Sequence, residues 1–86
     1  MLKIYLHSKV VCIDPNATII ANKQAFTPGQ IMDFPAPHGA VKILQCQSGY
    51  NWIDGSTRKN ITCYVNKWTS FPPPCVSKLD FHYFIN

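Results

Sequence analysis

The stretch GAVKILQCQSGYNWIDGSTRKNITCYVNKWTSFPPPC, residues 39–75, holds three of the four cysteines and decides the fold. It is rich in β-branched and aromatic residues, and the whole chain contains no Glu. Because strong helix formers are scarce, this composition favours strands and turns. We expect strands over 40–46 and 58–65. Since alternate side chains of a strand point to opposite faces, Ile61 and Cys63 should point inward in the second of them.

Working outward, the remainder of the chain also favours strands. Its 86 residues are enough for a single domain, but a core of that size is marginal and usually needs disulfides, a metal or a partner. The β-branched run 18–21 predicts a further short strand, and no stretch has the period of an amphipathic helix. Apolar residues alternate along 79–85, which predicts that this tail packs as an extra strand or pairs with another chain through self-association.

The charge pattern excludes one class of function and permits another. Eight Lys and Arg face four Asp, giving a formal net charge of +4. Only Arg58 and Lys59 are adjacent, whereas a nucleic-acid surface needs a denser basic stripe, so no nucleic-acid partner is expected. An acidic partner such as a sulfated glycan is permitted. No apolar run reaches the ~18 residues of a membrane span.

The cysteines indicate an oxidising compartment. Gaps of 33, 16 and 11 residues separate them, and none matches the close pairs of zinc ribbons or thioredoxin-like sites. Four cysteines in a short, proline-rich chain therefore indicate two disulfides. Glycosylation sequons begin at Asn16 and Asn60. We expect a secreted protein or the extracellular face of a membrane protein, with the chain a mature or excised fragment. A cytosolic protein with free thiols is the alternative.

Catalytic and metal-binding signals are weak. The three histidines, His7, His38 and His82, lack the i, i+4 spacing of metal ligands. Asp14 and Asp54 occupy ordinary turn contexts, and a Cys–His nucleophile would need a free thiol. We therefore expect no enzyme, no metal and no cofactor.

An ordered set of residues identifies a family resemblance. Gly49-Tyr50 follows the second cysteine, Gly55 precedes the third, Trp68 lies between the third and fourth, and Pro74 precedes the fourth. Over residues 12–75 the chain resembles the complement control protein module, also called the sushi module or short consensus repeat. The resemblance implies a small all-β, disulfide-rich module with short antiparallel strands.

The resemblance also implies specific roles for these residues. In that family the first cysteine pairs with the third and the second with the fourth, which here gives Cys12–Cys63 and Cys46–Cys75. Trp68, with Tyr50, would fill the core between the two disulfides. The flanks, residues 1–11 and 76–86, are longer than the few residues that usually join tandem modules.

The function that the resemblance implies is extracellular protein recognition without catalysis, as in complement regulation, cytokine or receptor binding, or adhesion. A stand-alone secreted immunomodulator or inhibitor is one alternative, favoured by the long flanks. An accessory module of a secreted protease is another. The partner is expected to be an extracellular protein, with a sulfated glycan as a second class. The candidate contacts are exposed aromatic and basic side chains: Phe34 and His38 on the proline-rich loop 28–38, Trp52 if exposed, and Arg58 and Lys59.

Overall fold

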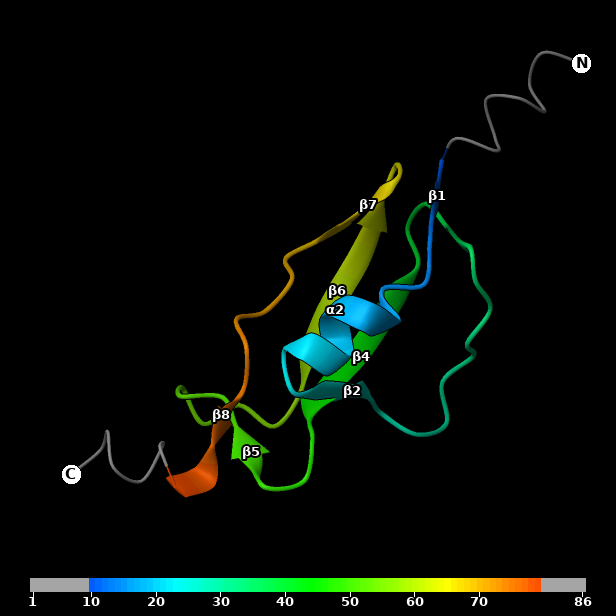
Figure 1. Ribbon diagram of the computed structural model, residues 1–86. Coiled ribbons are helices and arrows are strands. Elements are labelled where there is room, and N and C mark those ends of the chain that lie inside the picture. Colours follow the sequence, from blue (N-terminus) through cyan, green and yellow to red (C-terminus); the bar gives the residue numbers. More distant parts are fainter. Residues whose placement is uncertain (1–9, 80–86) are drawn as a thin grey trace, which may run out of the picture.

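The structure of the protein is a computed structural model that describes residues 10–79 (Figure 1). It confirms a small all-β, disulfide-rich fold with antiparallel sheets and very little helix. The elements in chain order are β1 (Val11–Cys12), α2 (Asn16–Ala21), β2 (Gln24–Phe26), β3 (Ala36–Pro37), β4 (Val41–Cys46), β5 (Tyr50–Asn51), β6 (Lys59–Tyr64), β7 (Lys67–Thr69) and β8 (Val76–Ser77).

A four-stranded antiparallel sheet, in the order β2-β4-β6-β7, forms the middle of the molecule. β4 and β6 correspond to the two expected strands and pair in the register Val41 with Thr62. Ile61 and Cys63 are completely buried, whereas Asn60 is exposed, so the expected phase of β6 is confirmed. One face of this sheet carries Leu44 and Ile61 and packs against Ile19 of α2, whereas Val41 and Asn60 on the other face are exposed.

A two-stranded sheet and a disulfide lie toward each end of the elongated fold (Figure 1). β1 pairs with β3 at one end, and β5 pairs with β8 at the other. The disulfides join Cys12 to Cys63 and Cys46 to Cys75, which is the pairing that the resemblance implies. Each one ties an end segment to a strand of the central sheet, where β pairing alone is only two residues long.

The helix α2 corrects the expectation of a strand over 18–21. Two backbone hydrogen bonds of helical spacing mark its two ends: Ile19 N–H donates to Pro15 O at 3.0 Å, and Asn22 N–H donates to Thr18 O at 3.0 Å. Ile19 is buried while Ile20 is exposed. A six-residue helix needs only one such anchor, and tertiary packing of that one side chain overrides the β preference of the run.

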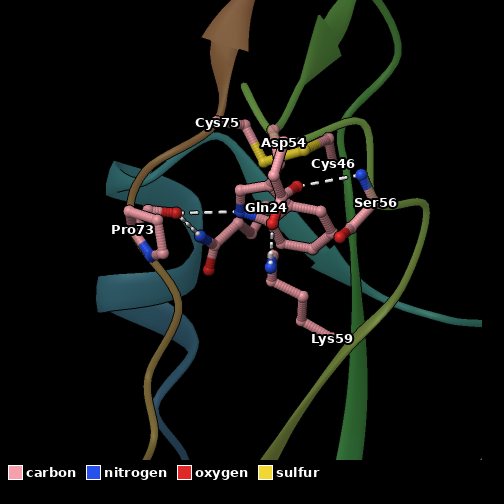
Figure 2. A network of polar contacts seen from close by, with 8 residues as sticks. Gln24, Cys46, Asp54, Ser56, Lys59, Pro73 and Cys75 are labelled. Atoms are coloured by element: carbon pink, nitrogen blue, oxygen red, sulfur yellow. Dashed lines mark hydrogen bonds and ion pairs between the residues drawn. A yellow bond between two sulfur atoms is a disulfide. The ribbon is translucent and has the colours of Figure 1, made fainter.

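The two tryptophans take different places in the core, and both Trp68 and Tyr50 pack against the central cluster as expected. Trp52 is 1% exposed in the central cluster and is therefore not a surface contact. Its indole N–H donates to Pro73 O at 2.9 Å, which ties the proline-rich segment before Cys75 to the core. Figure 2 shows Pro73 on this segment beside Gln24, whose Nε2 donates to the same oxygen. Trp68 is only half-buried, because β7 is an edge strand that is covered from one side. Tyr50 is also half-buried, at the margin of the cluster.

The predicted C-terminal strand falls mainly outside the described residues. Residues 80–86 lie beyond them, and so do residues 1–9. Leu79 is described and is strongly exposed. A strand does form just before it, at Val76–Ser77, where it pairs with β5. Packing or self-association through 79–85 remains a prediction.

Candidate interaction surface

The loop that joins β2 to β3, residues 27–35, carries the first predicted contact, Phe34. Its ring centroid lies 5.9 Å from that of Phe26 and 6.4 Å from that of Trp68, the latter edge-on. These three rings form a row along one side of the central sheet. Phe34 is half-buried in this row, so it both fixes the loop and shows part of its ring to solvent.

Gln30 fixes the backbone of this loop against β4. Its Nε2 donates to Ile43 O at 2.7 Å and to Thr27 Oγ1 at 2.8 Å, and its Oε1 accepts from Ile43 N–H at 2.8 Å. The Gln30 side chain thus bonds to the backbone of β4 in the way that a neighbouring strand would, although the loop itself has no regular structure. Because both of its polar atoms are used, the loop is tied to the sheet in a single register.

Lys42 provides a second tie. It is 7% exposed, and its ammonium donates a hydrogen bond to Ile31 O while lying 5.4 Å from the centroid of the Phe34 ring. A buried ammonium needs compensating partners, and here a carbonyl and an aromatic face supply them. The peptide that follows Ile31 is therefore held in place from inside the fold.

Held in this way, the loop points large apolar side chains into solvent. Ile31 is 75% exposed and Met32 is 42% exposed. Ile13 is 76% exposed, and its carbonyl accepts the Trp68 indole N–H at 2.7 Å, which links it through Trp68 to Phe34. We call this group the loop face; its members are Ile13, Ile31, Met32, Phe34 and Trp68. Apolar side chains on a backbone that is already ordered lose little further entropy when a partner covers them.

His38 lies elsewhere. Its Nδ1 accepts the Val65 N–H at 2.8 Å, and its ring centroid lies 5.3 Å from that of Tyr64. It therefore belongs to the tip of the β6–β7 hairpin. Tyr64, which His38 contacts, ends β6, whereas Lys59 begins it. The predicted contacts His38 and Lys59 therefore lie at opposite ends of this six-residue strand.

Lys59 is engaged within the fold. Its ammonium lies 2.6 Å from Asp54 Oδ2 and 5.6 Å from the centroid of the Trp52 ring (Figure 2). This hydrogen bond, followed by the Ser56 N–H that donates to Asp54 Oδ1 at 2.9 Å, lowers the pKa of Asp54 from 3.8 to about 2. Arg58 is exposed. The five predicted contacts therefore do not form one surface.

Sequence reasoning missed most of the loop face. Ile31 and Met32 lie in a stretch rich in prolines and glycine, without the alternation of a strand. Large apolar residues in such a segment were the available signal, since a solvated loop does not favour them. Nothing in the sequence indicated Ile13, because its place depends on Trp68, which is 55 residues away along the chain.

Residues 10–79 contain no cluster of potential metal ligands, no detected cavity and no helix able to cross a membrane. Comparisons with protein-family models, with curated proteins and with solved structures find no match for this chain.

Proposed function

We propose that this chain is an extracellular protein-binding module of the complement control type, and that the loop face is its contact surface. The observation that carries this proposal is the exposure of Ile31 and Met32 on a loop held by Gln30 and Lys42. Protein interfaces are centred on apolar and aromatic anchors, which is the chemistry of this surface. The resemblance of residues 12–75 and the two disulfides support the family and the extracellular setting.

The contact is expected to work through preorganisation. A flexible loop loses backbone freedom when it binds, at about 1–2 kcal/mol for each residue that becomes ordered. Here the backbone beside Ile31 is already bonded to Lys42, and Phe34 already packs on Trp68. The binding free energy can therefore come from covering Ile31 and Met32.

A matched pair of variants tests the proposal. The protein, with its disulfides intact, is immobilised and used to capture proteins from plasma and from cell-surface extracts. Ile31→Asp should reduce the amount of each captured partner about tenfold or more, the effect of losing one interface hot spot. Ile53→Asp is the control, because Ile53 is also strongly exposed but lies in the loop between β5 and β6.

Thermal melting must first establish that both variants are folded. If the native protein, Ile31→Asp and Ile53→Asp capture equal amounts, the contact surface does not include the loop. If the native protein captures no more than an unrelated disulfide-bonded protein does, the proposal of a protein-binding function is wrong.

A further inference from the structure

Basic side chains that are scattered in the sequence gather at one end of the fold. Residues 10–79 contain six basic and three acidic side chains. Four of the basic residues and one acidic residue lie near the β5–β8 sheet: in the α2–β2 turn, which bonds to Gln47, in the loop between β5 and β6, at the first residue of β6, and directly after β8. The rest of the described chain has two basic and two acidic side chains, so its charges balance. We call this group the basic end; its charged members are Lys23, Asp54, Arg58, Lys59 and Lys78.

Lys23 and Lys78 flank the same turn, residues 47–50. Gln47 N–H donates to Lys23 O at 2.9 Å, and Lys78 N–H donates to Gly49 O at 2.9 Å. The two backbones are therefore fixed on either side of the turn. Both side chains are exposed, and the Lys23 ammonium lies 5.9 Å from the centroid of the half-buried Tyr50 ring.

The ion pair in this region leaves most of its charge available. Asp54 pairs with Lys59 at 2.6 Å, and within residues 10–79 no carboxylate pairs with Lys23, Arg58 or Lys78. A surplus of like charge on one region attracts ligands of the opposite sign. The surplus charge is therefore suited to a ligand with repeated negative groups.

We propose that the basic end binds a sulfated glycan chain, with Lys23 and Lys78 as the principal contacts and Tyr50 as a flat surface beside them. Separated lysines around a turn match a linear polymer with regularly spaced sulfates better than they match a single anion. The two disulfides favour an oxidising, extracellular setting, whereas the strongly anionic lipid surface is the cytoplasmic one. This site is independent of the loop face.

Binding to heparin in solution tests the proposal at about 0.15 M salt, where charges more than about 8 Å apart are largely screened. Lys23→Gln and Lys78→Gln should each raise the Kd for heparin about twofold to fivefold, the range expected for one exposed ion pair. Lys67→Gln is the matched control, because Lys67 is exposed in the β6–β7 hairpin and its replacement removes the same charge. The Kd of Lys67→Gln for heparin should equal that of the native protein, and the native protein should not bind desulfated heparin.

Three results would overturn the proposal. The first is that the native protein does not bind heparin at this salt concentration. The second is an equal loss of affinity in all three variants, which would make the attraction a matter of net charge alone. The third is binding to vesicles that contain phosphatidylserine but not to heparin, because the exposed Ile53 and Leu79 would then be membrane contacts. Ile31→Asp should bind heparin normally, so failure of the loop face and failure of this site are distinguishable.

Discussion

Replacing Trp52 should destabilise this protein far more than replacing Trp68. A fully buried indole removes about 200–250 Å² from water, worth about 5–6 kcal/mol as an upper bound. Large-to-small core substitutions of Trp cost about 3–5 kcal/mol, and we expect Trp52→Ala to fall in this range. Pro73 O keeps one donor in that variant, the Gln24 Nε2 at 2.8 Å, so the cost is mainly a cavity (Figure 2).

Trp68→Ala should cost about 2 kcal/mol, because its indole is only half-buried. Its hydrogen-bond acceptor, Ile13 O, lies at the surface and can bond to water instead. A domain of 86 residues has a total stability of roughly 4–13 kcal/mol. At the low end of this range Trp52→Ala should leave a substantial unfolded population, whereas Trp68→Ala should remain mostly folded across the whole range.

Urea unfolding followed by far-ultraviolet circular dichroism, with the disulfides intact, measures both variants against the native protein. Trp52→Phe is a useful intermediate, because it keeps an aromatic ring but loses the N–H that donates to Pro73 O. It should lose about 1–2 kcal/mol. A larger loss for Trp68→Ala than for Trp52→Ala would refute this account of the core.

Three further predictions concern the ion pair, the loop and the outer sheet face. Lys59→Met should return the pKa of Asp54 from about 2 toward 3.8, as measured by NMR titration; since the folded-state pKa is lowered, the stabilisation is present above pH 3.8 and is lost as the pH falls through 2. Gln30→Ala should cost about 1–3 kcal/mol and speed hydrogen exchange at Ile43 N–H, whereas unchanged exchange would show that the loop is held by other contacts. Asn60 is exposed in β6, so protein secreted from eukaryotic cells should carry an N-glycan there, and Asn60→Gln should remove one glycan mass.

The parts of this fold that could be predicted from sequence have a local signal. β4 and β6 show alternation, and the inward phase of Ile61 follows from it directly. The pairing of Cys12 with Cys63 followed from the family resemblance, since four cysteines alone allow three pairings. The order of motifs in residues 12–75 thus carried more information than any single residue.

The roles of the tryptophans could not be predicted in this way. Trp52 is buried because residues 72–74 return across it, 20 residues later in the chain, and local periodicity does not report such a contact. The burial of Ile19 in a helix, rather than a strand, has the same origin. Both depend on which segment covers the sheet, and that is decided by tertiary packing.

The same physics explains how so small a fold keeps its irregular segments in place. Short strands leave many backbone groups without a ladder partner, and buried groups of this kind must still be bonded. Three buried or half-buried polar side chains meet this need: Gln24 bonds to Pro73 O, Gln30 to the backbone of Ile43, and Lys42 to Ile31 O. Each joins the central sheet to a segment that lacks regular structure.

In this arrangement, the residues that stabilise the fold are separate from the exposed side chains of the proposed contact surface. Trp52 and the disulfides hold the sheet together, whereas Gln30 and Lys42 determine how the loop is presented. Changes to the exposed side chains of Ile31 and Met32 touch neither set, so different apolar or polar contacts can be placed on the loop without loss of the fold. A disulfide-bonded sheet with a loop anchored by side chains can thus change its exposed surface while its core stays the same.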